Sequence, residues 1–490
     1  MEQKNKNIIR REIVNFRFDD GGDGIAIQQN IAAWCRDILN PQIDALIETF
    51  KASDEIIFIP QIKIDIDIDN KAAWQNEVTE KIMQQLKEKL DTAAAGNTEG
   101  ITVKTQSQNF SDSLLYYLKH GFLPWNAQIK NKDEFKTAFA AWLSVLSSAE
   151  IKYFLQEIDN AEKTERLMQA AGEKSTALLI ATVSNQSQNY VSALLRDIKL
   201  IAETVSKQKA ISVNKYFYFI QKFILLCLKT DITYPPGSVE KLWVDDIIKT
   251  EKLNAGVINT DLIKTAELKN IIHQHQRIKK EMAGKTDWIN ELPSAKKIKS
   301  TEKNKSKNKQ AGNGKTITDE QKKELAEGIF INNTGAIIIA PFLTALFEKT
   351  GIARDNKIID EDAALILIHY CVTGNTSPAE FELVLPKILC GIMPEQAVNT
   401  NKKISKKYLN EANEMLASVI EYWNVLKDTS IDALRETFLQ REGKLSFSND
   451  KWLLQVEQKP YDMLLQHIPW NISMVRLPWM QHVITTEWAV

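Results

Sequence analysis

The chain has 490 residues, with 62 lysines and arginines against 63 aspartates and glutamates, and its formal net charge is −1. Near-zero charge gives no global electrostatic reason to expect nucleic acid or a membrane surface as partner. With 44% hydrophobic residues, 18 glycines and 13 prolines, the composition predicts a soluble protein of two to four domains, rich in long helices.

Residues 1–95 predict a small N-terminal α+β domain. Apolar and polar residues alternate over 8–18 and 62–69, a pattern typical of half-exposed strands. Apolar residues at helical spacing over 25–50 and 71–91 predict two helices, and a proline within the first is expected to bend or split it. The first residues lack the apolar stretch of a signal peptide, and the four cysteines lack metal-ligand spacing, which favours a cytoplasmic protein with reduced thiols.

A helical middle region is predicted over 105–285, and a linker over 286–317. In the middle region, pairs of leucine, isoleucine and phenylalanine recur at helical spacing without sustained heptads, which favours packed antiparallel helices. Within the linker, residues 294–315 carry eight lysines against one glutamate, which predicts disorder. Because no aromatic residues interleave with these lysines, nucleic-acid binding is not expected.

Residues 318–490 predict a C-terminal module of helices followed by short strands. Its uncharged window, 329–347, is interrupted by turn residues and a proline, so we expect a buried turn and core helix rather than a stable membrane insertion. The expected fold class is therefore α+β and predominantly α-helical. The helices are expected near 336–349, 361–373, 378–391, 405–427 and 430–440, and the strands near 452–456, 472–477 and 482–488.

Tryptophan is concentrated at the end of the chain. Five of the 11 tryptophans fall in the last 68 residues, and two of them directly follow a proline, at Pro469-Trp470 and Pro478-Trp479. A proline before the largest apolar side chain predicts a rigid turn, either in a tightly packed module or on a docking surface. Both alternatives stay open, and Trp488 is the residue from which we most expect an outward contact.

No catalytic, cofactor or metal constellation is present in the sequence. The six histidines are scattered, and the motifs of serine hydrolases, zinc peptidases and dinucleotide-binding folds are missing. We therefore expect no enzyme activity, no cofactor and no metal site.

A series of short motifs carries a family resemblance. In the C-terminal module they are Asn332-Asn333-Thr334-Gly335, Ala340-Pro341-Phe342-Leu343, Val372-Thr373-Gly374, Glu380-Phe381-Glu382-Leu383, Leu389-Cys390-Gly391, Phe438-Leu439-Gln440-Arg441-Glu442-Gly443 and Ile468-Pro469-Trp470. Near the N-terminus they are Ile8-Ile9-Arg10-Arg11-Glu12-Ile13-Val14 and Gly121-Phe122-Leu123-Pro124-Trp125. In this order they resemble the tape measure proteins of contractile injection systems, over about 1–125 and 325–490.

This resemblance implies a structural protein that sets the length of the inner tube and sheath. It implies a place in the tube lumen, anchoring at the baseplate hub, and several identical copies per particle. The expected partners are tube, hub, spike and baseplate proteins, with assembly in the cytoplasm and possible release with the particle.

Two alternatives remain open. A literal ruler should be one long helix at about 1.5 Å per residue, whereas the middle region contains aromatic patches typical of a packed core. The chain could therefore plug or organise the baseplate without measuring length. The second alternative is an unrelated helical binding module.

Overall fold

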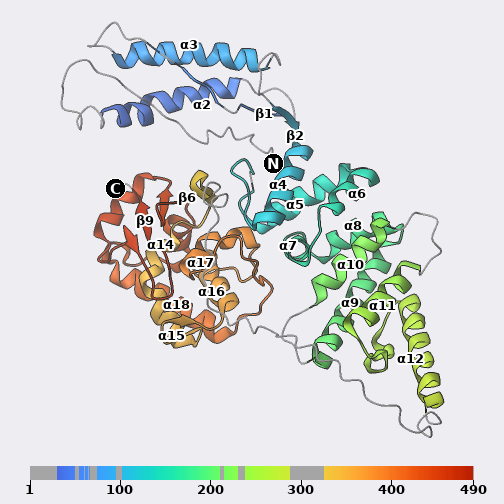
Figure 1. Cartoon of the computed structure of the whole chain (residues 1–490). Coiled ribbons are helices and arrows are strands. Elements are labelled where there is room, and N and C mark those ends of the chain that lie inside the picture. Colours follow the sequence, from blue (N-terminus) through green and yellow to red (C-terminus); the bar gives the residue numbers. More distant parts are fainter. Residues whose placement is uncertain are drawn as a thin grey trace. The chain divides into compact units, whose positions relative to one another are not determined.

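The computed structural model describes residues 30–49, 55–59, 61–64, 66, 74–94, 102–127, 129–209, 215–229, 238–286 and 325–488 (Figure 1). The chain divides into two compact units, Met1–Leu114 with Trp125–Gln128, and Leu115–Pro124 with Ile129–Val490. Helices dominate the described residues, which confirms the predicted fold class. The predicted strand 8–18 and the lysine-rich linker lie outside the described residues, and the predicted domain bounds stay predictions.

The first unit pairs two helical segments around a small core. The π-helix η1 (Cys35–Leu39) continues into α2 (Asn40–Thr49), which packs against α3 (Trp74–Ala94). At the centre, the Trp34 indole N–H donates to Thr79 Oγ1 at 3.0 Å, and the ring contacts Trp74 edge-on. Pro41 does not split the helix. Because proline lacks an N–H and crowds the preceding turn, the chain widens into a π-turn just before it.

The strand expected over 62–69 is wrong where the structure describes it. Residues 61–64 and 66 form no strand, yet Ile62, Ile64 and Ile66 are half-buried against the core of α2 and α3, and Lys63 is exposed. The alternation therefore predicted which side chains face inward but not the hydrogen bonding. The strands of this unit are instead β1 (Glu55–Phe58) and β2 (Thr102–Thr105), which pair antiparallel.

The helical middle region is confirmed. Its helices begin at polar residues whose side chains accept the first free backbone N–H groups, as Asn131, Ser147 and Asn160 do. The helices are α4 (Gln106–His120), α5 (Lys132–Val145), α6 (Ser148–Gln156), α7 (Ala161–Ala171), α8 (Glu173–Ser184), α9 (Gln188–Lys209), α10 (Tyr216–Lys229), α11 (Ser238–Glu251), η2 (Ala255–Val257), η3 (Thr260–Leu262) and α12 (Ala266–Thr286).

The C-terminal module is mainly helical up to residue 439 and has most of its strand residues after that, as predicted, but β3, β4 and β5 precede or interrupt the helices. The helical elements are α14 (Ala336–Ile339), η5 (Ala340–Phe342), α15 (Leu343–Thr350), α16 (Glu361–Thr373), η6 (Glu380–Leu383), α17 (Val384–Leu389), α18 (Lys406–Tyr422), η7 (Asn424–Leu426), α19 (Ile431–Leu434), η8 (Arg435–Leu439) and η9 (Pro460–His467). The strands are β3 (Ile329–Ile331), β4 (Ala353–Arg354), β5 (Lys357–Ile358), β6 (Gly443–Ser448), β7 (Lys451–Val456), β8 (Met474–Val475) and β9 (Ile484–Glu487).

Five of these strands form one sheet in the order β3-β6-β7-β9-β8. The β7–β9 pair is parallel, and the other neighbours are antiparallel. Asn449 and Asp450 join β6 to β7 with positive φ angles at both positions, the geometry of the tightest hairpin turns. Gly335 begins α14 where an added Cβ would lie 1.8 Å from the Phe438 carbonyl oxygen, so the motif around it requires glycine.

The uncharged window 329–347 forms core, as expected. Ile337, Ile338 and Ile339 are fully buried, and α16 packs beside them. No helix in the described part of the chain is both long and apolar enough to cross a bilayer.

A buried ionic network joins the helical region to the C-terminal module. The Arg166 guanidinium of α7 donates to Glu380 of η6 from Nε at 2.9 Å, and the Lys387 ammonium of α17 donates to the same carboxylate at 2.6 Å. All three side chains are essentially inaccessible to solvent. Arg166 also donates to the carbonyls of Leu118 and Lys119 at the end of α4. Three separate segments of the chain, α4, α7 and the continuous η6–α17 stretch, are therefore joined around one carboxylate.

Gly121 makes room for this network. It follows α4 at φ +79°, and an added Cβ would lie 2.7 Å from Glu380 Oε1. The glycine that opens the first Pro-Trp motif thus allows the end of α4 to approach the ion pairs.

Replacing Glu380 by glutamine should destabilise the second unit by about 3–5 kcal/mol, because the change leaves the buried Lys387 without its counter-charge and Arg166 with only the exposed carboxylate of Glu162. The matched control is Glu162→Gln, which removes the exposed carboxylate that also pairs with Arg166. Its effect should stay within about 1 kcal/mol. Urea unfolding of both variants measures the difference, and equal midpoints would contradict a structural role of the network.

Candidate docking surface

Three of the five C-terminal tryptophans, Trp423, Trp452 and Trp488, belong to the buried core. Trp423 and Trp452 are fully buried. The Trp423 ring contacts Phe438, and its indole N–H donates to the Leu464 carbonyl at 3.1 Å. These two rings hold η9 and the β6–β7 hairpin against the helices and are not available to a partner.

The two Pro-Trp steps make the same interaction with two different helices. Trp470 donates its indole N–H to the carbonyl of Ile338 in α14 at 2.9 Å, and Trp479 donates to the carbonyl of Leu389 in α17 at 2.8 Å. The last carbonyls of a helix lack partners within it, so each indole caps a helix C-terminus. Both rings are half-buried, and Pro469 and Pro478 before them are exposed.

Close packing fixes each capping tryptophan in place. The Trp470 ring meets Phe342 edge-on with centroids 4.9 Å apart, and the Trp479 ring stacks on Phe347. After α17, Gly391 lies so close that an added Cβ would be 2.6 Å from the Trp479 carbonyl oxygen. The Pro-Trp repetition thus reflects a repeated structural role, and only the outer parts of these residues reach the surface.

Trp488 does not face outward, contrary to our expectation. Its ring is only 7% exposed, and its indole N–H donates to Asp462 Oδ2 at 3.0 Å. The guanidinium of Arg441 lies over the same ring, 5.3 Å from its centroid. Trp488, which follows β9, therefore packs against the buried ion pair of Arg441 and Asp462.

Arg441 and Asp462 form that ion pair, and the sequence did not reveal its role. Two parallel hydrogen bonds of 2.8 Å join guanidinium and carboxylate. Arg441 also donates to the Glu457 carbonyl, and Asp462 accepts the backbone N–H of Lys459. Burial by itself would raise the pKa of Asp462, but the hydrogen bonds from Arg441, Lys459 and Trp488 together lower it below its ordinary value.

The ion pair also reaches the start of the module. Thr334 donates both its backbone N–H and its hydroxyl to the Arg441 carbonyl oxygen, at 3.1 and 2.9 Å. Its neighbour Asn333 donates to the Glu382 carbonyl at 2.7 Å. The Asn332–Gly335 motif is thereby bonded to the Phe438–Gly443 motif, more than a hundred positions later in the sequence. Each motif alone is a weak sign of the family.

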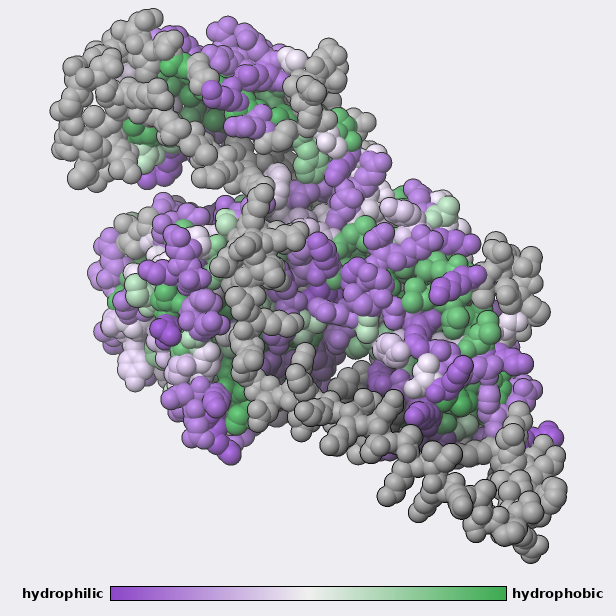
Figure 2. Space-filling view, viewed as in Figure 1, coloured by the Kyte–Doolittle hydropathy of each residue, from purple (hydrophilic) through white to green (hydrophobic). Residues whose placement is uncertain are grey.

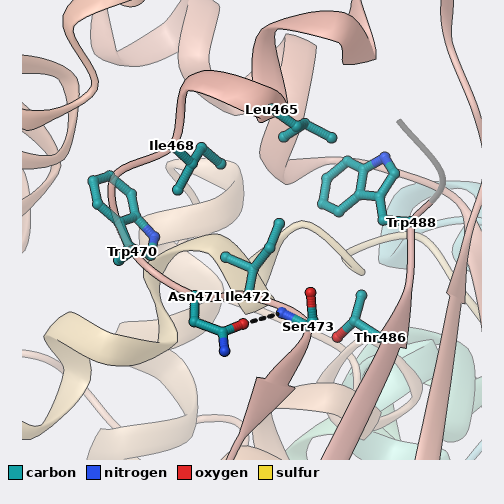
Figure 3. A pocket seen from close by; sticks show the side chains of 8 residues that line it. All are labelled: Leu465, Ile468, Trp470, Asn471, Ile472, Ser473, Thr486 and Trp488. Atoms are coloured by element: carbon teal, nitrogen blue, oxygen red, sulfur yellow. Dashed lines mark hydrogen bonds between the residues drawn. The ribbon is translucent and has the colours of Figure 1, made fainter.

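A cavity of about 180 Å³ opens beside this closed end (Figure 3). Trp470 and Trp488 stand on opposite sides of it, with Ile472 between them and Ser473 and Thr486 along the strands below. Thr486 Oγ1 is buried without a hydrogen-bond partner among the described residues. The cavity is partly open, and its lining mixes apolar side chains with polar groups. The full lining is Leu465, Ile468, Trp470, Asn471, Ile472, Ser473, Thr486 and Trp488.

Exposed apolar side chains are neighbours in sequence of residues that line the cavity. Met463 of η9 is 65% exposed, and Met474 of β8 directly follows a residue of the lining. Trp470 contacts Phe342, whose ring stacks on Tyr422, itself 62% exposed. We call Tyr422, Met463, Trp470, Met474 and the cavity the terminal apolar surface. On the face shown in Figure 2, hydrophilic side chains dominate the described surface of the chain and apolar ones gather in small patches.

The described residues contain no group of three or more His, Cys, Asp or Glu side chains placed to hold a metal ion. Cys227, Cys371 and Cys390 are buried, and burial raises the pKa of each thiol. His369 is buried too, and burial lowers its pKa to about 4. These groups are typical of a packed interior.

Comparison with known proteins decides the family. The sequence model for contractile injection system tape measure proteins matches residues 6–488. The chain belongs to this family. No curated protein and no solved structure matches the tape measure chain.

The stabilisation by the Arg441–Asp462 ion pair should depend on pH and be lost in acid. Because the pKa of Asp462 is lower in the folded chain than in the unfolded chain, its stabilisation is complete above about pH 4 and is lost as pH falls through the folded pKa. Asp462→Asn should cost about 3 kcal/mol at pH 7, and this difference should shrink towards pH 3.

Urea unfolding at several pH values measures this, with Asp432→Asn as the control. Asp432 is exposed, and its partner Arg435 keeps hydrogen bonds to the carbonyls of Cys371 and Tyr370, so the loss of this carboxylate should change stability by less than about 1 kcal/mol at any pH. A penalty for Asp462→Asn that stayed constant across the pH range would argue against a charged pair.

Proposed function

We propose that this tape measure protein is a structural assembly component that sets tube and sheath length from within the tube lumen while its C-terminal module docks at the baseplate hub. The proposal assigns it tube, hub and spike proteins as partners, several identical copies in the lumen, assembly in the cytoplasm and no catalytic step. The terminal apolar surface is the observation that carries the docking part.

Three properties of this surface support docking. Its exposed members are methionine and aromatic residues, the types enriched at protein interfaces. It surrounds a cavity lined by both apolar side chains and the polar groups of Asn471, Ser473 and Thr486, into which a side chain of a partner could insert. Its tryptophans are immobilised by hydrogen bonds, Trp470 to the Ile338 carbonyl and Trp488 to Asp462, so little side-chain freedom remains to be lost on binding.

Aspartate at the exposed positions should abolish docking without unfolding the module. Met463→Asp combined with Tyr422→Asp places charges on the terminal apolar surface, and we expect at least a tenfold loss of co-purified hub and tube proteins. Because both side chains are exposed, the unfolding midpoint should stay near that of the unchanged chain.

The control is Tyr153→Asp, at an equally exposed aromatic residue of α6 outside the C-terminal module. This variant should assemble normally. Wild-type levels of particle assembly and co-purification in the double variant would remove the docking proposal.

The measuring role has a competitor, a baseplate organiser that does not itself measure length. In the described middle region the longest helix is α9, with 22 residues, and helices α5–α11 pack on one another. Phe219, Phe223 and Trp243 are buried at the centre of this region, and the Trp243 indole N–H donates to the Phe219 carbonyl. A literal helical ruler therefore requires this packed region to open inside the tube.

Inserting about 40 helix-forming residues near Gly312 separates the two roles. A literal helical ruler should lengthen tubes by roughly 60 Å at 1.5 Å per residue, measured by electron microscopy of particles. An insertion of 40 glycine and serine residues is the control for added chain without added helix. Particles of unchanged length with both insertions would exclude the literal ruler and favour the organiser.

A further inference from the structure

Residues 390–405 connect α17 to α18, and one side-chain amide holds this 390–405 loop against α7. The Gln169 oxygen accepts the Thr400 hydroxyl at 2.8 Å and the Thr400 backbone N–H at 3.3 Å. The Gln169 nitrogen donates to Glu165 Oε1, one helical turn earlier, at 2.8 Å. Gln169 and Thr400 are 2% and 1% exposed. The contact between loop and helix therefore depends on a buried amide that is bonded to Glu165.

Glu165 lies in a cluster that holds more carboxylates than cations. Arg166 pairs with Glu162 and Glu380, and Lys387 pairs with Glu380. Among the residues that the structure describes, Glu165 makes no ion pair. With Glu165 ionised, four negative groups face two positive ones: Glu162, Glu165, Asp362 and Glu380 against Arg166 and Lys387.

The loop contributes to this cluster directly. The Asn399 backbone N–H donates to Asp362 Oδ1 at 3.0 Å, and the Glu395 carbonyl accepts a hydrogen bond from Arg166. Further titratable side chains on the elements around α7 include Lys119 and His120 of α4, Lys132 of α5, Glu173 of α8, Tyr216 of α10, Asp360 and Glu361 at the start of α16, Glu382 of η6, and Glu395 and Lys402 of the loop.

The charge state of Glu165 changes near neutral pH. Burial, followed by the negative charges of Glu380, Asp362 and Glu162, raises the pKa of Glu165 to about 7. A glutamate in solvent has a pKa of about 4.3, so the closed junction binds a proton that an open junction releases. The resulting stabilisation is complete below about pH 4 and is lost as the pH rises through 7.

We propose that Glu165 is a proton-dependent latch: its neutral carboxyl group keeps the 390–405 loop closed on α7, and its ionisation releases the loop. The closed state dominates in mild acid, and the open state gains population as the pH rises above neutral. The latch lies where the helical region meets the C-terminal module, and it is independent of the docking and measuring roles proposed above.

Hydrogen exchange of the full chain at pH 6 and pH 8, read by mass spectrometry, tests the latch. Protection of 396–402, relative to an unstructured peptide at the same pH, should fall about tenfold between these pH values. Glu165→Gln has nearly the same shape and stays neutral. It should remove this fall and give about tenfold more protection than the unchanged chain at pH 8.

The matched control is Glu203→Gln, at an exposed carboxylate of α9, which should keep the pH dependence of the unchanged chain. Burial also raises the pKa of Glu382 to about 7, so a tenfold fall that persists in Glu165→Gln would assign the titration to Glu382 and overturn the proposal. Protection of 396–402 that is equal at pH 6 and pH 8 in the unchanged chain would overturn it as well. An equal fall in α16 would indicate global unfolding and contradict a local latch.

Discussion

One buried carboxylate, that of Glu380, holds the larger unit together. Arg166 and Lys387 give up hydration to reach it, and for Lys387 it is the counter-charge. The arrangement also needs a glycine at 121 and the free carbonyls at the end of α4. Because these groups come from three separate segments of the chain, the native packing of the C-terminal module against the helical region depends on all three.

Around the terminal apolar surface, too, side chains from distant segments are held by specific hydrogen bonds. The large polar side chains near it have specific partners: Arg441 pairs with Asp462, and the indoles of Trp470 and Trp479 cap two helices. These hydrogen bonds fix the positions of the aromatic rings. At the cavity, the Thr486 hydroxyl is buried and lacks a hydrogen-bond partner among the described residues. The aromatic rings of this surface are therefore held in fixed positions, and the cavity between them is empty of protein atoms.

The spacing of apolar residues along the sequence predicted the elements whose formation depends on local sequence. The helices of the middle region and the β7 strand were readable because apolar spacing reports which side of an element is covered. Hydrogen-bond partners across the fold were not readable. The isoleucines of 62–66 show this, since they face inward without forming a strand. Arg166 and Glu380 are 214 positions apart, and nothing local distinguishes Glu380 among 63 acidic residues. The burial of Trp488 was not predicted, because its position near the end of the sequence carries no information on whether its ring is exposed.

The strand directions have a mechanical consequence. β3 is antiparallel to β6, β6 to β7, and β7 is parallel to β9, so β3 and β9 point the same way. The chain enters the sheet at the base of β3 and leaves at the opposite end of β9. Tension applied between these two points pulls along the strands in shear, and neighbouring ladder hydrogen bonds share the load instead of opening one after another. A module held at one end and pulled at the other is thus oriented to resist force.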